Sequence, residues 1–360
     1  MKKTPFFEIH TQLDAKISFF GGYQMPIQYS GVRQEHLAVR QNLGVFDVSH
    51  MGEFIVEGSH AFDLLQFICS NDISKLIPGK AQYNYLPNDQ GGVVDDLIVY
   101  QLQNEKYLLV VNASNVEKDW SHIVRQNKKF NVKLYDVSEK TALLSIQGPK
   151  ALTAMQSICN AKLHQLSYFS HTTNTFAGVE NVMVATTGYT GAGGIEIYFD
   201  VSDAEKIWKA VMEAGSNFGI LPVGLAARDT LRLEMGYCLY GNEINEQSSP
   251  ISAGLEWVTK PHTGFLNAAM HQKLIDEGTT EKLVGFQIDE RGIPRLGYLL
   301  FDTDENHIGR VTSGTQSPSL NKGIGLGYVK TKFSKPGQKI SVKIREKFVP
   351  ASVVKLPFVK

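Results

Sequence analysis

The stretch that decides how this chain folds is Gly91-Gly92-Val93-Val94-Asp95-Asp96-Leu97-Ile98-Val99-Tyr100. Its β-branched and aromatic residues are typical of a strand, but aspartate is disfavoured there because its side chain competes for backbone hydrogen bonds. Successive strand residues point to opposite faces of a sheet, so the two carboxylates cannot work as a pair. We therefore expect one aspartate to face water or structure and the other to face a site.

Turn residues on both sides of this strand predict an antiparallel meander of three strands. A six-residue turn at 87–92 precedes the strand, and a three-residue turn at 103–105 follows it. The flanking segments 82–86 and 106–112 have the composition of strands. The chain therefore crosses the same sheet three times in succession.

The two turn lengths set a register in which Asp96 lies opposite Tyr83 on one neighbouring strand and opposite Asn112 on the other. The second pairing begins with Leu102 opposite Lys106. Opposed residues share one face of a sheet, with their Cβ atoms ~5 Å apart. A ring, a carboxylate and an amide would then form a polar row, and the other aspartate would point to the opposite face. A solvated polar stripe is the structural alternative, and a one-residue slip would destroy the row.

Composition indicates a globular protein with several cores. The chain has 360 residues, of which 42% are hydrophobic and 10% aromatic, so two or three domains are expected. Its 36 basic and 36 acidic residues give a formal net charge of +0, whereas a nucleic-acid-binding protein normally has a basic excess. No apolar run approaches the ~20 residues that span a bilayer, and no signal or transit peptide is evident. We expect a cytoplasmic protein that binds neither nucleic acid nor membrane.

Cysteine and histidine usage argues against disulfides and against a metal centre. The three cysteines, Cys69, Cys159 and Cys238, are odd in number and far apart. Buried free thiols in a reducing compartment are therefore expected. The ten histidines form no His-x-x-x-His pair and no cluster with cysteine. We predict no metal site.

A second notable segment, Thr186 to Glu196, contains four glycines. Glycine permits left-handed dihedrals and the close approach of a ligand to the backbone. The segment is not a phosphate-binding loop, because the required lysine is missing and a strand follows instead of a helix. A glycine-rich hairpin turn is the structural alternative. Glu196 alternates with Ile195 and Ile197, so its carboxylate faces away from them, either to solvent or to a ligand with paired N–H donors.

Segment 223–235 is amphipathic and predicts a helix that ends at Gly236. Arg228 and Arg232 stand one turn apart on it, where like charges repel unless an anion compensates them. A solvated helix face is the structural alternative to an anion site.

Other segments complete the expected organisation. Helical spacing of apolar residues predicts helices at 61–70, 116–130 and 201–213, the last capped by Ser202 or Asp203. Beyond residue 281 the helical periodicity disappears, and turn residues recur between short strands. That pattern is typical of a separate β-barrel or sandwich.

Seven motifs, in their order along the chain, resemble those of the glycine cleavage system T-protein family. They are Gly44–Gly52, Gly91–Tyr100, Leu144–Pro149, Thr187–Gly191, Gly224–Glu234, Cys238–Ile244 and Val311–Leu320. The resemblance covers essentially the whole chain. It implies an α+β fold, a three-domain cloverleaf of antiparallel sheets around a central folate channel with a C-terminal β-barrel or jelly-roll domain. The implied parts are a discontinuous folate-binding domain (1–52 plus 138–245), a domain with the catalytic aspartate (53–137), a linker (246–280) and the barrel (281–360).

The resemblance also implies an activity. Members of this family are aminomethyltransferases of glycine catabolism. They pass the one-carbon unit of an aminomethyl-dihydrolipoyl carrier, the H protein, to tetrahydrofolate, which gives 5,10-methylene-tetrahydrofolate, ammonia and the dihydrolipoyl carrier. The family needs no metal and leans towards monomers. Its catalytic aspartate matches Asp96, and its folate-binding positions match Tyr83, Asn112, Tyr189, Glu196, Arg228, Tyr237 and Met51.

These residue types suit a reduced folate. The pterin ring presents adjacent N–H and NH₂ donors, which one carboxylate can accept as a pair. Tyrosine rings suit a flat heterocycle, and a guanidinium suits an acceptor or a carboxylate of the folate. A fixed anion at Asp96 could accept a proton and stabilise the positive charge that develops on the transferred carbon.

Two other kinds of protein share this fold and stay open as alternatives. Non-catalytic folate binders that maintain iron–sulfur proteins carry a Lys-Gly-Cys-Tyr/Phe-x-Gly-Gln-Glu signature. This chain instead has Gly236-Tyr237-Cys238-Leu239-Tyr240-Gly241-Asn242-Glu243, the transferase form. Demethylase-type one-carbon transferases are often fused to a flavin domain, for which 360 residues leave no room.

Overall fold

The computed structural model describes residues 1–360, which form two compact units. The first unit comprises Met1–Leu65, Ile73–Asn84 and Leu97–Asp229. The second comprises Gln66–Asp72, Tyr85–Asp96 and Thr230–Lys360. Four elements have residues in both units, namely α3 (Ala61–Ile68), β6 (Lys80–Pro87), β7 (Val93–Gln103) and α7 (Leu225–Met235).

The largest sheet of the first unit has the strand order β11-β12-β13-β10-β4-β14. These strands are β4 (Leu43–Asp47), β10 (Thr141–Gln147), β11 (His171–Phe176), β12 (Val179–Ala185), β13 (Gly194–Asp200) and β14 (Ile220–Pro222). One face of the sheet joins α5 (Ala151–Met155) and α6 (Ala204–Gly215) in an apolar core. Because strand residues alternate, Glu196 and Tyr198 lie on the opposite face.

The predicted meander is present in the other large sheet, whose order is β6-β7-β8-β5-β9. Its remaining strands are β5 (Gly52–Glu57), β8 (Lys106–Val111) and β9 (Lys133–Asp136). The predicted register of β7 and β8 is confirmed from Leu97–Val111 to Gln101–Tyr107. The predicted pairing of Leu102 with Lys106 is wrong, because Gln103 pairs with Lys106 and Leu102 lies in a bulge between Gln101 and Gln103. The turn is thus one residue shorter than predicted, and the bulge restores the register.

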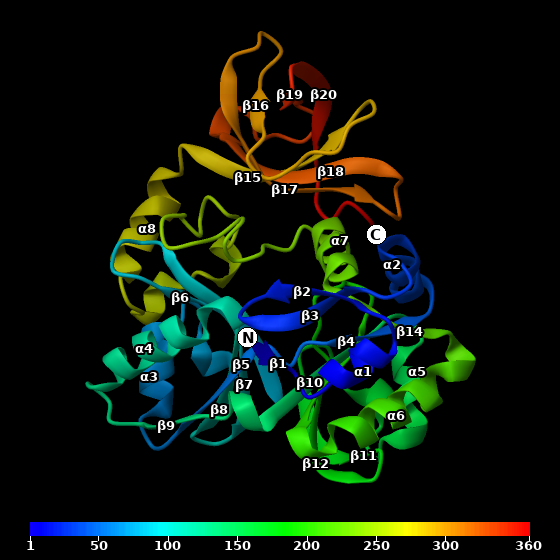
Figure 1. Ribbon diagram of the computed structural model, residues 1–360. Coiled ribbons are helices and arrows are strands. Elements are labelled where there is room, and N and C mark those ends of the chain that lie inside the picture. Colours follow the sequence, from blue (N-terminus) through cyan, green and yellow to red (C-terminus); the bar gives the residue numbers. More distant parts are fainter. The chain divides into compact units, whose positions relative to one another are not determined.

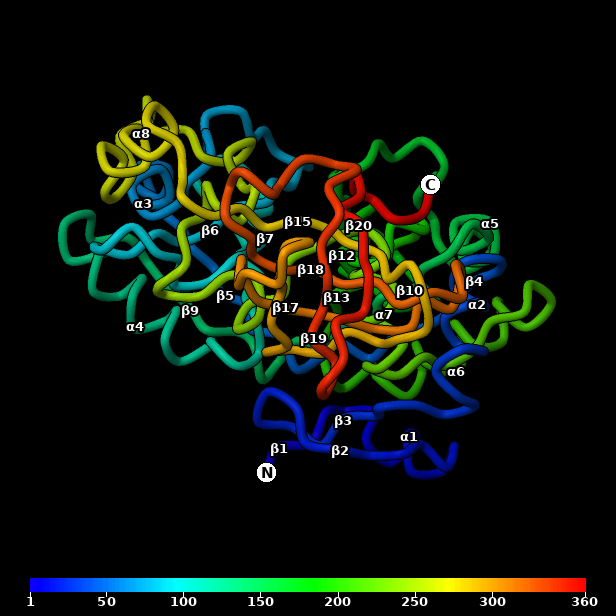
Figure 2. The backbone as a smooth tube through the Cα atoms, turned by 90° about the horizontal axis from the view of Figure 1, so that it is seen from above, coloured from blue at the N-terminus to red at the C-terminus, as the bar shows by residue number.

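Three short strands and a helix begin the first unit, in a region for which the sequence pattern predicted no elements. Strands β1 (Lys2–Lys3), β2 (Lys16–Phe20) and β3 (Tyr23–Gln28) form a separate sheet. Helix α1 (Phe7–Gln12) connects β1 to β2, and α2 (Val32–Gln41) follows β3. Figures 1 and 2 both show β2 and β3 side by side at the blue end of the chain.

The predicted helices are present, with differences at their ends. Helix α3 is Ala61–Ile68 and α4 is Val116–Asn127, so α4 ends earlier than predicted. Helix α7 ends as predicted at Gly236, which has φ +72 and donates to the carbonyl of Leu233. Asp203, one of the two residues predicted to cap α6, occupies its N-cap position, but its side chain forms no capping hydrogen bond. Asp200 instead accepts hydrogen bonds from the backbone and hydroxyl of Ser202 and starts a 3₁₀ turn before the helix.

The C-terminal part of the second unit is the predicted barrel, and it is closed in the order β15-β18-β17-β16-β19-β20. Figure 1 shows these strands in yellow-orange to red. They are β15 (Glu281–Ile288), β16 (Leu299–Phe301), β17 (His307–Ser317), β18 (Lys322–Lys330), β19 (Lys339–Ile344) and β20 (Lys347–Val354). Its interior is apolar, with Phe286, Val311 and Val342 fully buried.

Segment 246–280, which was predicted as a linker, is folded. It contains helix α8 (Ala268–Glu277) and 3₁₀ turns at Glu256–Val258 and Pro261–Thr263. Val258 and Phe265 are buried, so the segment contributes to a core. None of the helices α1 to α8 has the length and apolar character needed to cross a bilayer.

Candidate functional site

All eight residues that the sequence nominated for the site are half-buried. A side chain that binds a ligand has to be both packed and accessible, and half-burial meets that requirement. Six of the residues belong to the first unit, and Asp96 and Tyr237 belong to the second. The six are Met51, Tyr83, Asn112, Tyr189, Glu196 and Arg228.

The glycine-rich segment is a turn between β12 and β13 that Gln147 holds in place. Gln147 donates from Nε2 to the carbonyl of Thr187 (3.1 Å) and accepts at Oε1 from the hydroxyl of Thr190 (2.9 Å). A Cβ on Gly188 would lie 2.1 Å from that same Oε1, so a side chain at this position would displace the amide of Gln147. These contacts fix the backbone on both sides of Tyr189.

The carboxylate of Glu196 faces away from the apolar core, as its alternation with Ile195 and Ile197 predicted. Both isoleucines are fully buried, while Glu196 is half-buried on the other face of β13. Its Oε2 accepts a hydrogen bond from the hydroxyl of Thr187 at 2.6 Å. This bond holds one carboxylate oxygen and leaves Oε1 available to a ligand.

The first turn of α7 positions Arg228, and a buried glutamate anchors that turn. Gly224 donates its backbone N–H to Oε2 of Glu35 at 2.8 Å. The other oxygen of Glu35 accepts from the backbone N–H groups of Tyr29 (2.7 Å) and Gly31 (2.9 Å). The start of the helix is therefore tied to the end of β3, and Arg228 follows one turn later.

The guanidinium of Arg228 stacks on a ring and keeps an unused donor. Its Cζ lies 4.9 Å from the ring centroid of Tyr189, within the range of a cation–π contact. Its Nη1 is buried and has no hydrogen-bond partner. Burial lowers the pKa of Arg228, and the nearby charge of Glu196 opposes that shift. Because an unpaired buried donor is costly, this atom indicates a place for an acceptor or an anion.

Arg232 has a different role from Arg228. The alternative that this face of α7 is solvated is wrong at Arg232. Its side chain is 1% exposed and forms an ion pair with the fully buried Glu243 (Nη1 to Oε2, 2.9 Å). It also donates to the hydroxyl of Ser313 (2.8 Å) and to the carbonyl of Tyr237 (3.0 Å). Arg232 thus fixes the backbone at Tyr237, a residue nominated for the site.

The two aspartates of β7 differ as expected, because Asp95 is fully buried and Asp96 is half-buried. Within the second unit, Asp96 lies close enough to Cys238 for its charge to affect the pKa of the Cys238 thiol. Burial raises the pKa of Cys238 first, and the charges of Glu243 and Asp96 raise it further. The row of Tyr83, Asp96 and Asn112 stays a prediction.

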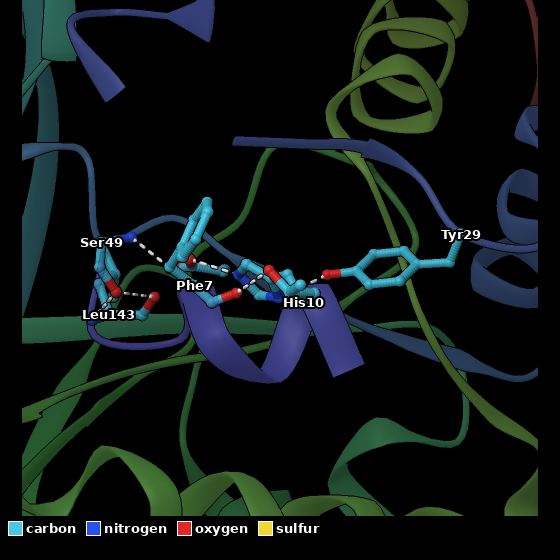
Figure 3. Close-up of polar contacts among 7 residues, drawn as sticks. Phe7, His10, Tyr29, Ser49 and Leu143 are labelled. Atoms are coloured by element: carbon cyan, nitrogen blue, oxygen red, sulfur yellow. Dashed lines mark hydrogen bonds and ion pairs between the residues drawn. The ribbon is translucent and has the colours of Figure 1, made fainter. Parts of the chain in front are cut away.

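A buried histidine clamp fixes the turn that ends at Met51 (Figure 3). His10 on α1 donates from Nε2 to Oδ2 of Asp47 at 2.9 Å, and its Nδ1 lies 2.9 Å from the hydroxyl of Tyr29. Burial alone would raise the pKa of Asp47, but the hydrogen bond and charge of His10 lower it. Asp47 also accepts a hydrogen bond from the backbone N–H of Ser49. The hydroxyl of Ser49 donates to the carbonyl of Leu143 and accepts from its backbone N–H.

His50 is a residue of this region that the sequence reasoning missed. Its side chain is 2% exposed, and its Nδ1 has no hydrogen-bond partner. Burial lowers the pKa of His50 to about 4, with Asp47 opposing and Arg228 adding to the shift. The imidazole is therefore neutral near pH 7. The only signal in the sequence was its place directly before Met51 in a quoted motif.

Comparison with known proteins decides the family. The GCVT N-terminal domain model matches residues 6–263, and the glycine cleavage T-protein C-terminal barrel domain model matches residues 281–360. The chain belongs to the glycine cleavage T-protein family.

Relatives of this T-protein family member match it over their full length. An aminomethyltransferase of Flavobacterium psychrophilum is 54% identical over 360 residues, and one of Bacteroides thetaiotaomicron is 54% identical over 362 residues. Each match covers 100% of both chains. The crystal structure of the glycine cleavage system aminomethyltransferase T from Bartonella henselae superposes with a TM-score of 0.92 at 33% identity. That match covers 99% of this chain and 98% of the other.

The predicted family, fold class and activity are thereby confirmed: this T-protein is an aminomethyltransferase, an enzyme that transfers a one-carbon unit. Full-length similarity to aminomethyltransferases disfavours the alternatives of a non-catalytic folate binder and a demethylase-type transferase. Tetrahydrofolate is the co-substrate that the family implies.

Proposed function

We propose that this T-protein accepts the aminomethyl group from a lipoylated carrier, the H protein, and that Glu196, Arg228 and Tyr189 hold the tetrahydrofolate that receives its carbon. When bound, tetrahydrofolate supplies the two nitrogen atoms that accept the one-carbon unit. The protein supplies binding groups, orientation and a fixed charge. The cytoplasmic location and monomeric state expected from the sequence belong to this proposal.

The unused hydrogen-bonding capacity of Glu196 and Arg228 carries the proposal. Glu196 offers a carboxylate with one oxygen already anchored, which suits the paired N–H donors of a pterin. Arg228 offers a buried Nη1 without a partner, which suits an acceptor atom or a carboxylate of the folate. The two residues provide opposite charges near one another, so a ligand with both donors and acceptors fits them best.

Asp96 is the proposed catalytic residue. Its half-buried carboxylate could orient the folate nitrogens, accept a proton and stabilise positive charge on the carbon in transit. Tyr83, Asn112 and Met51 of the first unit and Tyr237 of the second are further residues proposed to bind the folate, through rings, an amide and an apolar side chain. Asp95 is fully buried and is proposed to have a structural role.

The test is a complete assay with purified protein, tetrahydrofolate and an aminomethylated lipoyl carrier. We expect release of ammonia and formation of 5,10-methylene-tetrahydrofolate. Absence of both products would contradict the proposal. Thermal stabilisation by tetrahydrofolate without turnover would instead identify a folate-binding protein. Glu196→Gln should raise the Kd for tetrahydrofolate about tenfold or more, because it removes a charge-assisted acceptor.

A further inference from the structure

A chain of three buried hydroxyl groups ends on Glu196 and is not used by the function described so far. The hydroxyl of Tyr198 lies 3.0 Å from that of Tyr100, which lies 2.9 Å from the hydroxyl of Thr187. Thr187 then donates to Oε2 of Glu196 at 2.6 Å. The three hydroxyl-bearing residues are 5%, 0% and 3% exposed in that order, so water does not compete for these bonds.

The carboxylate at the end of the chain decides the direction of every hydrogen bond in it. An ionised carboxylate only accepts, so Thr187 must use its single proton on Glu196. The oxygen of Thr187 can then only accept from Tyr100, whose own oxygen must accept from Tyr198. Burial raises the pKa of both Tyr100 and Tyr198, so both hydroxyls stay protonated. All three protons therefore point toward Glu196.

Packing holds each member of the chain in place. The ring of Tyr100 meets the ring of Tyr198 edge-on, with centroids 5.7 Å apart, and meets that of His171 at 5.6 Å. His171 is itself fixed, because its Nε2 lies 2.9 Å from the carbonyl of Gln101. At the other end, Gln147 fixes the backbone of Thr187. Neither aromatic ring can turn its hydroxyl away without losing these contacts.

We propose that Thr187, Tyr100 and Tyr198 are positioning residues that hold the carboxylate of Glu196 in the orientation in which it receives tetrahydrofolate. A glutamate side chain has three rotatable bonds, and anchoring one oxygen removes most of that freedom before the ligand arrives. The linked hydroxyls polarise one another and strengthen the last bond. This inference rests on the proposed role of Glu196 as a folate receptor.

The decisive variants change Thr187. Thr187→Val keeps a branched side chain of similar shape and removes the donor, while Thr187→Ser keeps the donor. We expect Thr187→Val to raise the KM and the calorimetric Kd for tetrahydrofolate about tenfold, with the KM for the carrier protein changed less than about twofold. Thr187→Ser should bring both values for tetrahydrofolate back to within about threefold of the parent.

Two further variants grade the effect along the chain and keep the test valid if Thr187→Val does not fold. Tyr100→Phe removes the donor to Thr187 and should raise the Kd for tetrahydrofolate by roughly threefold to tenfold. Tyr198→Phe removes only the far end of the chain and should have the smallest effect. An order other than Thr187, Tyr100, Tyr198 would overturn the proposal.

Tyr85→Phe is the matched control, because it breaks a buried tyrosine–threonine contact that does not lead to Glu196. The hydroxyl of Tyr85 lies 3.0 Å from that of Thr259, and Tyr85 is fully buried. This variant should leave the Kd for tetrahydrofolate unchanged. A loss equal to that of Tyr100→Phe would mean that any buried hydroxyl matters equally, and it would overturn the positioning role.

The outcomes separate this inference from the proposed function. If Glu196→Gln weakens binding of tetrahydrofolate and Thr187→Val does not, Glu196 is a receptor that needs no positioning chain, and only the inference fails. If Glu196→Gln leaves the Kd unchanged, the proposed role of Glu196 fails first. If Thr187→Val raises both KM values and Thr187→Ser does not rescue it, the chain is merely structural.

Discussion

Glu53 on β5 should make the free energy of unfolding fall as the pH rises. Its side chain is fully buried, and neither carboxylate oxygen has a hydrogen-bond partner. Burial first, and then the charge of Asp136, raises the pKa of Glu53 well above its ordinary value. The folded protein therefore keeps a proton on Glu53 over a pH range in which the unfolded chain releases it. Glu53→Gln removes the titrating group at nearly constant shape.

The size of the effect follows from linkage between protonation and folding. Below about pH 4.3, an ordinary glutamate is protonated in both states, and Glu53 contributes no pH dependence. Above that value the unfolded state binds fewer protons than the folded state, so the free energy of unfolding falls by up to about 1.4 kcal/mol per pH unit. The fall continues until the pH passes the raised pKa. Over two pH units, the free energy of unfolding of Glu53→Gln should therefore rise by up to about 2.7 kcal/mol relative to that of the parent.

The assay is urea unfolding of the parent and of Glu53→Gln at pH 5, 6, 7 and 8, with the difference in free energy of unfolding plotted against pH. Glu53→Met serves as the control, because it also lacks the titrating group but differs in packing. For both variants, the difference in free energy of unfolding from the parent should change with pH at the same slope, while its absolute value differs because the packing differs. A difference that does not change with pH in either variant would refute the reasoning, and a slope of opposite sign would mean that Glu53 is an ionised, stabilised group.

Three further predictions concern two charged residues of the proposed site, Asp96 and Arg228, and the buried Arg232. Asp96→Asn should lower kcat about 100- to 1,000-fold and change the Kd for tetrahydrofolate little, because it removes charge stabilisation during the reaction. If Asp95→Asn lowers kcat more than Asp96→Asn does, the register argument is wrong. Arg228→Met should weaken tetrahydrofolate binding about tenfold without lowering the thermal midpoint, since it removes a buried donor that has no partner; unchanged binding in calorimetry would count against the site. Arg232→Met should lower the free energy of unfolding, measured with urea, by about 3–5 kcal/mol, because it leaves the carboxylate of Glu243 buried without its cation. A decrease below about 1 kcal/mol would contradict that account.

The meander could be predicted because its signals are local. Alternating apolar residues and turn residues specified β6, β7 and β8 and the register of the last two near Leu97. The bulge at Leu102 could not be predicted, because a two-residue turn with a bulge uses the same number of residues as a three-residue turn. The shorter turn and the bulge compensate each other, so the predicted register holds from Gln101 back to Leu97.

Long-range contacts account for most of what the sequence could not predict. The spacing of Arg228 and Arg232 is the same whether a helix face is solvated or buried, and the ion partner of Arg232 lies beyond the end of the helix. The hydroxyl chain joins Tyr100 to residues almost a hundred positions away. The clamp between His10 and Asp47 likewise joins separate elements, and an isolated histidine or aspartate has no pattern that reveals its partner.

The composition of the second unit has a consequence for how the protein is made. Residues Tyr85–Asp96 belong to the same compact unit as Thr230–Lys360. The backbone N–H of Val93 bonds to the carbonyl of Asn245, and Asn88 donates to the carbonyl of Glu246. A ribosome that adds 5–20 residues per second needs roughly 8–30 s to extend the nascent chain from Asp96 to Glu246. During that interval the strand that carries both aspartates lacks the partners that fix its start, so the proposed catalytic strand is among the last parts of the enzyme to be completed.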